Sequence, residues 1–265
     1  MRRKSLNVAL CLALAISARH LAAASKTLDQ VRTIVKQIQR ADYQGDRREL
    51  KRLYNQMAPF VAVAPEVRYW RGFAMWRSAL NGFNDGVDPE ELLADLEHAE
   101  TEFGQVRPRH PIAVEAKIGT ASCLANRAAV LYVRKETAIA TDLLNRSRAL
   151  LKEMESQAAK NPRYLWVLGA NLWYAAPDRG GGQSAAIQTY QLGLTAARAA
   201  TAPGDPLKPI WGEAELLMNL AWSNLHKSVP DLTAAASYAQ SALNLVPYWH
   251  YVRDILVPQI QLRMK

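Results

Sequence analysis

Apolar side chains recur at spacings of three and four along almost the whole chain, which is the periodicity of an amphipathic α-helix. One example is residues 28–38, where Leu28, Val31, Val35 and Ile38 share a helical face. Runs of alternating Val, Ile and Thr, which would predict half-buried strands, are nearly absent. The sequence therefore predicts an all-α protein.

The expected helix starts are marked by proline and by one capping residue. Proline fits the first turn of a helix because the N–H group that it lacks would have no partner there. Asp46 is a typical N-cap residue, with Glu49 three positions later. We expect further helices to begin near six prolines: Pro65, Pro89, Pro111, Pro162, Pro206 and Pro230.

Four of the predicted helices carry a small residue near the middle: Gly72, Gly119, Gly169 and Ala221, with successive spacings of 47, 50 and 52 residues. Glycine inside a helix costs about 1 kcal/mol relative to alanine, so its recurrence predicts that a partner helix comes close there. A second helical segment follows each of the four, at residues 89–100, 140–155, 183–194 and 231–243. The repeating unit is therefore a helical hairpin, in which the small residue meets its own second helix. Residues 28–58 form a further pair.

The hairpin resembles the tetratricopeptide repeat (TPR) over roughly residues 60 to 250. The first-helix pattern of that family is matched by Leu165, Leu168, Gly169 and Leu172, and the second-helix pattern by Ala186, Tyr190 and Gly193. The period of about 50 departs from the 34 residues of an ordinary repeat. The resemblance implies an all-α, TPR-like solenoid of about five hairpins, with residues 248–263 as a C-terminal capping helix. It does not specify the function.

One face of the first helices carries the candidate binding residues. In tetratricopeptide repeats this face lines the concave surface, which implies a groove with aromatic walls for a protein or peptide partner, or for a small apolar ligand. The same stripe also fits ordinary packing against neighbouring helices, so both interpretations stay open. The groove residues are Tyr69, Phe73, Trp76, Ala116, Thr120, Cys123, Trp166, Ala170, Trp173 and Trp222.

Three consecutive glycines in the segment AAPDRGGGQSAA, residues 175–186, have two interpretations. A phosphate-binding P-loop is excluded because it needs a lysine and a preceding strand. A tight turn between two helices is the preferred interpretation. The alternative comes from a resemblance to secreted bacterial TPR-like proteins, including the T-component of TRAP transporters, which carry a Pro-x-x-Gly-Gly-type loop. It implies an anion held by Arg179, Gly180, Gly181 and Gly182 at a helix N-terminus.

The first 24 residues have the layout of a signal peptide. Arg2, Arg3 and Lys4 precede an apolar run at residues 8–16, and small residues at 22–24 offer a cleavage site. The run is too short to span a membrane. We therefore expect a periplasmic or secreted domain at residues 25–265 with no membrane span. Removing four basic residues and no acidic ones lowers the net charge from +9 to +5, which does not indicate nucleic-acid binding.

No motif in the sequence predicts catalysis. The histidines of the mature chain, at positions 98, 110, 226 and 250, have no metal-ligand spacing, and Cys123 has no histidine nearby in sequence. We expect no catalytic residue, metal or cofactor. The leading hypothesis is non-catalytic binding of a protein or peptide. A small-molecule carrier of the TRAP-associated kind is the alternative, and a helical enzyme assembled across hairpins is a weaker one.

Overall fold

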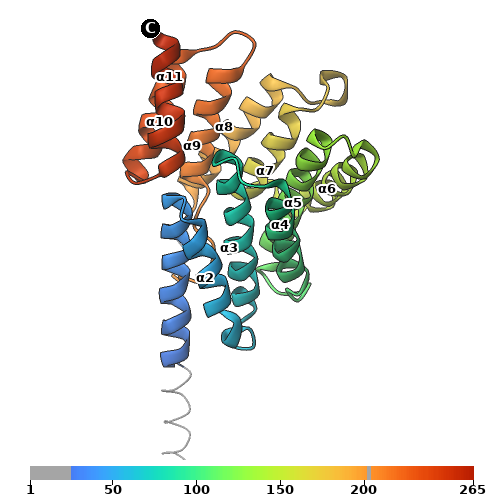
Figure 1. The fold of residues 1–265 in the computed structure, drawn as a ribbon, viewed down its shortest axis with the longest axis vertical. Helices are drawn as coiled ribbons and strands as arrows, with labels where there is room; N and C mark the ends of the chain where they lie inside the picture. Colours follow the sequence, from blue (N-terminus) through green and yellow to red (C-terminus); the bar gives the residue numbers. More distant parts are fainter. Residues whose placement is uncertain (1–24, 202–203) are drawn as a thin grey trace, which may run out of the picture.

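The computed structural model describes residues 25–201 and 204–265, and these residues form helices and their connections (Figure 1). They contain no β-strand, which confirms for this part of the chain that the fold is all-α, as predicted. None of the described helices combines the length and the apolar character needed to cross a membrane. The predicted signal peptide, residues 1–24, lies outside the described residues.

The elements follow one another with short connections, apart from a longer one between α8 and α9. In chain order they are a helix over residues 25–44, α2 (Arg47–Gln56), η1 (Ala58–Phe60), α3 (Pro65–Asn84), α4 (Pro89–Gly104), α5 (Ala113–Val133), α6 (Thr137–Ala158), α7 (Pro162–Trp173), η2 (Pro177–Arg179), α8 (Gln183–Ala199), α9 (Glu213–His226), α10 (Leu232–Leu245), η3 (Tyr251–Leu256) and α11 (Val257–Met264). Of the three short elements, η1 and η2 are 3-10 helices and η3 is a π-helix.

The helices pack in consecutive pairs, α3 with α4, α5 with α6, α7 with α8, and α9 with α10. The first helices of successive pairs, α3, α5, α7 and α9, also contact one another in that order. The predicted series of helical hairpins is therefore confirmed. The predicted C-terminal cap is present as η3 and α11, which pack against α10.

Most of the predicted helix starts are confirmed. Pro65, Pro89 and Pro162 are the first residues of α3, α4 and α7. The Asp46 side chain accepts a hydrogen bond from the Glu49 amide at 2.9 Å, as expected for an N-cap. The prediction for Pro206 was wrong, since no helix begins until Glu213.

The recurrent small residues lie where helices approach closely, but one of them meets a different helix from the one expected. A Cβ atom built on Gly72 would lie 2.7 Å from the Phe103 ring of α4, and one on Gly169 would lie 2.3 Å from the Tyr190 ring of α8. Both glycines therefore meet the second helix of their own hairpin. Gly119 instead approaches the same Phe103 ring, with a Cβ distance of 2.5 Å, so it meets the preceding hairpin. Ala221 is fully buried.

The two ends of the row of hairpins meet (Figure 1). Tyr43, near the end of the first helix, packs edge-on against Trp249 with ring centroids 5.0 Å apart. Its hydroxyl donates a hydrogen bond of 2.8 Å to Glu215 on α9. The Trp70 indole of α3 donates to the carbonyl oxygen of Leu207 at 2.8 Å. The first helices of the hairpins therefore lie around the segment that precedes α9.

Candidate functional site

The predicted groove face divides into a buried part and an open part. Six of its residues are buried in the core: Tyr69, Phe73, Trp76, Ala116, Cys123 and Trp166. Thr120, Trp173 and Trp222 are partly exposed, and Ala170 is exposed. The expectation of a groove along all four hairpins is therefore corrected, because the groove residues of α3 are buried and the open part lies on α7 and α9, with Thr120 of α5 partly exposed.

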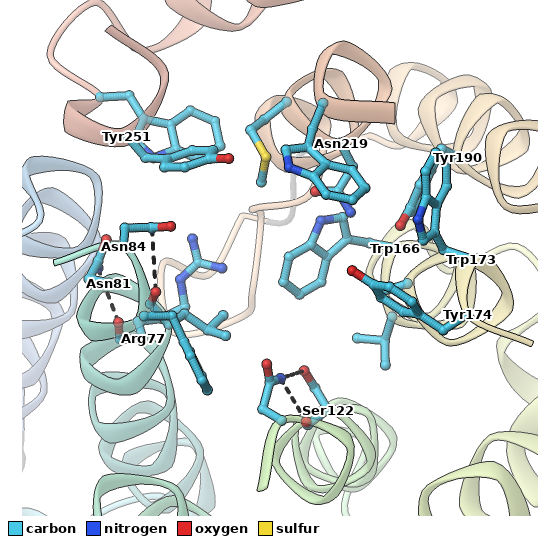
Figure 2. A pocket seen from close by; sticks show the side chains of 18 residues that line it. Arg77, Asn81, Asn84, Ser122, Trp166, Trp173, Tyr174, Tyr190, Asn219 and Tyr251 are labelled. Carbon is cyan, nitrogen blue, oxygen red and sulfur yellow. Dashed lines mark hydrogen bonds between the residues drawn. The ribbon is translucent and has the colours of Figure 1, made fainter. Parts of the chain in front are cut away.

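A cavity of about 300 Å³ lies beside the open part of this face (Figure 2). Its lining comes mainly from α3, α5, α7, α8, α9 and η3, so side chains distant in sequence surround one space. Four predicted groove residues line it: Trp166, Ala170, Trp173 and Trp222. This volume falls within the range that proteins use for small ligands and for parts of a peptide.

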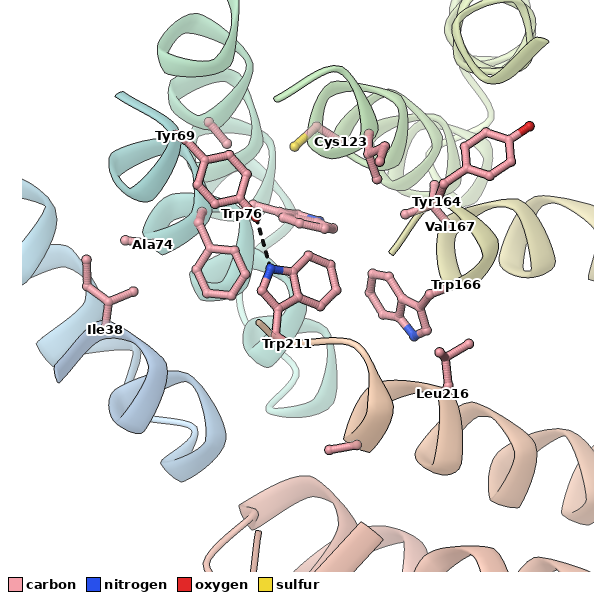
Figure 3. Close-up of a cluster of buried hydrophobic side chains, with 14 of the residues drawn as sticks. Ile38, Tyr69, Ala74, Trp76, Cys123, Tyr164, Trp166, Val167, Trp211 and Leu216 are labelled. Carbon is pink, nitrogen blue, oxygen red and sulfur yellow. Dashed lines mark hydrogen bonds between the residues drawn. The ribbon is translucent and has the colours of Figure 1, made fainter. Parts of the chain in front are cut away.

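The buried part of the predicted groove is filled by Trp211, from the segment before α9 (Figure 3). Its indole lies between Trp76 and Trp166, with centroids 5.6 Å from each, and donates a hydrogen bond of 2.9 Å to the Tyr69 hydroxyl. The aromatic stripe of the second hairpin is therefore core. The sequence places Trp211 off the helical stripe as an ordinary core or cap residue, and it is buried, but its segment has no periodic signal that would predict its position in the groove.

Aromatic rings form the wall of the cavity near α9. Trp173 meets Trp222 edge to face at 5.1 Å, and Trp222 stacks on His226 at 4.4 Å. Tyr251 lines the cavity from the π-helix η3, and burial raises the pKa of its hydroxyl to about 12. Such rings offer large, stiff contact surfaces at low entropic cost.

The polar lining offers acceptors and donors. The Nδ2 groups of Asn81, Asn84 and Asn126 each donate to the carbonyl oxygen four residues earlier, and none of their Oδ1 atoms accepts a bond from another described residue. The Nη1 atom of Arg77 and the Nε1 atom of Trp166 are buried and have no hydrogen-bond partner among the described residues. The cavity can therefore hydrogen-bond to a ligand that carries both N–H and C=O groups.

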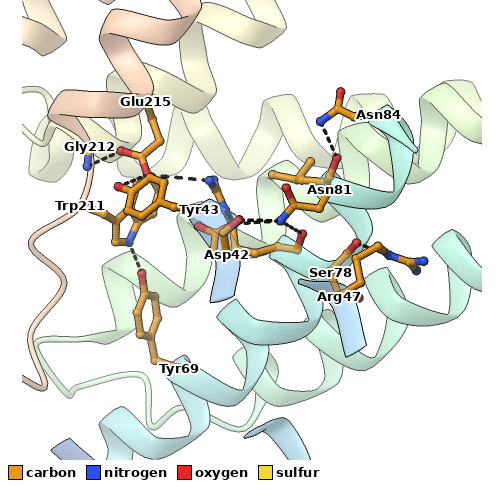
Figure 4. A network of polar contacts seen from close by, with 12 residues as sticks. Asp42, Tyr43, Arg47, Tyr69, Ser78, Asn81, Asn84, Trp211, Gly212 and Glu215 are labelled. Atoms are coloured by element: carbon orange, nitrogen blue, oxygen red, sulfur yellow. Dashed lines mark hydrogen bonds and ion pairs between the residues drawn. The ribbon is translucent and has the colours of Figure 1, made fainter. Parts of the chain in front are cut away.

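Arg77 lines the cavity and also belongs to a buried charged network. Figure 4 shows the acids of this network, Asp42 and Glu215. The Nε of Arg77 donates to Asp42 at 2.8 Å, and its Nη2 lies 3.8 Å from Glu215. Burial raises the pKa of both carboxyl groups, even though the guanidinium attracts their charged forms. Asn81 and Tyr43 donate further hydrogen bonds to these carboxylates. One guanidinium thus faces two buried acids.

This imbalance predicts a pH effect on stability. The folded pKa of each acid lies above its unfolded value of about 4. At a pH between these two pKa values, the folded chain keeps a proton that the unfolded chain has lost. The free energy of unfolding therefore falls as the pH rises through this range. We expect Glu215→Gln to flatten that fall and to stabilise the protein by about 1 kcal/mol at pH 8. Urea unfolding at pH 5 and pH 8 measures both the pH dependence of the free energy of unfolding and the gain in stability. Glu213→Gln, a partly exposed acid two residues away, should leave the pH dependence as it is.

The glycine loop is a turn whose amides are already used. The amide groups of Gly180, Gly181 and Gly182 donate to carbonyl oxygens of Pro177, Ala176 and Leu172, at 3.0, 3.1 and 2.8 Å. The prediction that these glycines bind an anion is therefore wrong, because their amide groups already donate to carbonyl oxygens and are not free to bind one. The turn does require glycine, since φ is +75° at 180 and +97° at 182, and a Cβ at 181 would lie 2.4 Å from that of Ala175.

Cys123 and one histidine have clear surroundings in the described part of the chain. Cys123 is fully buried, and burial raises the pKa of its thiol well above the ordinary value, which suppresses the reactive thiolate. His250 pairs with Asp254 at 2.9 Å on the outside of the cavity. In the described part of the chain, no cluster of three or more His, Cys, Asp or Glu residues has the arrangement of a metal site.

Comparison with protein-family models, curated proteins and solved structures finds no match for this chain. The likeness to tetratricopeptide repeats therefore rests on the residue pattern described above.

Proposed function

We propose that this chain is a non-catalytic, TPR-like binding protein that holds an extended peptide segment of a protein partner in the cavity beside α7 and α9. The periplasmic or secreted location expected from residues 1–24 belongs to the same proposal.

The observation that carries this proposal is the mixture of side chains that line the cavity. An extended peptide presents N–H and C=O groups in alternation, and both need partners when they leave water. The unpaired Oδ1 atoms of Asn81, Asn84 and Asn126 can accept from the N–H groups. The buried donors of Arg77 and Trp166 suit C=O groups. Trp173 and Trp222 supply the aromatic contact that anchors peptide side chains.

A second observation favours a peptide over a compact small molecule. A further cavity of about 490 Å³ lies between α5, α6 and α7 and shares part of its lining with the first, including Asn126, Ala170 and Tyr174. A chain that occupies the first cavity can therefore continue into the second. The alternative, a small-molecule carrier, needs only the first.

Trp222→Ala tests this function directly. Panning a phage library of random dodecamer peptides on the purified protein should enrich a defined set of sequences, and synthetic copies should bind the variant at least tenfold more weakly, because truncated aromatic anchors cost about 2 kcal/mol or more. Fluorescence anisotropy measures the two dissociation constants. Tyr248→Ala removes a part-exposed ring outside the cavity and should bind as the wild type does.

Other outcomes would point elsewhere. A library that yields no enriched sequence, together with small molecules that raise the melting temperature of the wild type and not of Trp222→Ala, would support the carrier. Enriched peptides that bind both variants equally would place the binding surface away from this cavity.

A further inference from the structure

The packing between successive hairpins is interrupted at one place. The second helix of a hairpin packs broadly on the first helix of the next at α2–α3, α4–α5 and α8–α9, whereas α6 and α7 touch at few positions. Two cavities, of about 490 and 410 Å³, occupy the space that this gap leaves. Arg148 and Asn171 line both of them. We call these two cavities the α6–α7 cleft.

The cleft carries positive charge that the protein does not balance. Arg148 on α6 and Arg179 in η2 line it, and the guanidinium group of neither has an ion pair or a hydrogen bond with another described residue. The other charged residues of its lining, Lys152 and Glu155, pair with each other. By contrast, Arg146, two residues from Arg148, pairs with Asp142 outside the cleft. The unbalanced charge at this cleft suits a ligand with a carboxylate.

A buried acceptor in the same cleft suits a peptide backbone. The Nδ2 group of Asn171 donates to the Val167 carbonyl oxygen at 3.1 Å, while its Oδ1 atom is buried with no donor among the described residues. A buried oxygen of this kind is costly when no donor reaches it, and a backbone N–H would supply one. Around it, Ala125, Ala129 and Ala170 leave room for a small apolar side chain.

The cleft continues the cavity described above, since the 490 Å³ space shares Asn126 and Ala170 with it. A segment of this chain is a poor occupant, because residues 1–24 carry four basic residues and no acidic ones. A second copy also brings a net positive charge to a basic surface, +9 for the full chain and +5 without residues 1–24. A separate partner of opposite charge fits better.

We infer that the partner segment is acidic: an extended peptide whose small apolar residue enters the α6–α7 cleft and whose neighbouring Asp or Glu pairs with Arg148 and Arg179. This inference rests on the proposed function, because it assigns the chemistry of the same peptide where it leaves the first cavity.

Charge reversal at Arg148 tests the inference. Peptides enriched on the wild type from the random dodecamer library are expected to share an Asp or Glu beside a small apolar residue. A fluorescein-labelled synthetic copy should bind Arg148→Glu at least tenfold more weakly, and its affinity for the wild type should fall as the salt concentration rises. Arg146→Glu, on the same helix and outside the cleft, should bind as the wild type does. Replacing the peptide's acidic residue with Lys should recover part of the lost binding to Arg148→Glu, because the new Lys can pair with Glu at position 148 while Arg179 still repels it.

The results separate this inference from the proposed function. Peptides without a shared acidic residue, or with equal affinity for Arg148→Glu and Arg146→Glu, would overturn the inference while leaving a Trp222-dependent cavity in place. Peptides that bind Trp222→Ala as well as the wild type but depend on Arg148 would keep the basic α6–α7 cleft as a binding site for an acidic segment and would remove the first cavity from the function. Circular dichroism of each variant establishes that it is folded.

Discussion

Gly169→Leu is expected to lower the free energy of unfolding by about 3 kcal/mol, because the new side chain has no space between α7 and α8. A Cβ atom alone would lie 2.3 Å from Cε1 of Tyr190, well inside van der Waals contact. Tyr190 is itself buried, so its ring can move aside only by disturbing other core side chains. Urea unfolding followed by circular dichroism measures the change.

Two further variants tie this loss to the helix approach. Gly104→Leu places the same side chain at the end of α4, where a Cβ has no neighbour within 4 Å, and should cost far less. Tyr190→Ala opens space for the leucine, so the double variant Gly169→Leu/Tyr190→Ala should be more stable than the sum of the two single losses predicts. An unchanged melting temperature for Gly169→Leu would contradict the close approach at this position.

Much of this architecture follows from local signals in the sequence. Apolar periodicity and N-terminal prolines locate the helices, and the mid-helix glycines at 72 and 169 identify the close approach within each hairpin. Gly119 shows the limit of such reasoning. A small residue indicates that something comes close, but it does not say which helix does so, and here the ring of Phe103 lies against two glycines from successive hairpins.

The candidate site was only partly predictable, because long-range contacts decide which part of an apolar stripe stays open. Trp211 comes from a segment with no helical periodicity and closes the face near Tyr69. The asparagine side chains that line the cavity follow no common position in the repeat, so the repeat alignment did not select them. The α6–α7 cleft arises from a packing difference between hairpins of similar sequence pattern, which no local signal reports.

The buried charges are likewise invisible to sequence spacing, yet Arg77 carries the largest predicted effect. Arg77→Met should lower the free energy of unfolding by about 4 kcal/mol at pH 7.5, because Asp42 and Glu215 would then lie buried without a compensating charge. Both acids already have raised pKa values, since burial disfavours their charged forms. Without the guanidinium these pKa values rise further, so the folded state holds its protons to higher pH. The loss should therefore be smaller at pH 5 than at pH 7.5.

Neutralising the acids separates the charge effect from the loss of packing. The triple variant Asp42→Asn/Arg77→Met/Glu215→Gln should recover most of the stability at pH 7.5 and should lose the dependence on pH that the single variant shows. Arg198→Met breaks an exposed pair with Glu213 and should leave the free energy of unfolding nearly unchanged. A triple variant no more stable than Arg77→Met, or a loss independent of pH, would mean that the packing of the Arg77 side chain, and not its charge, stabilises this region.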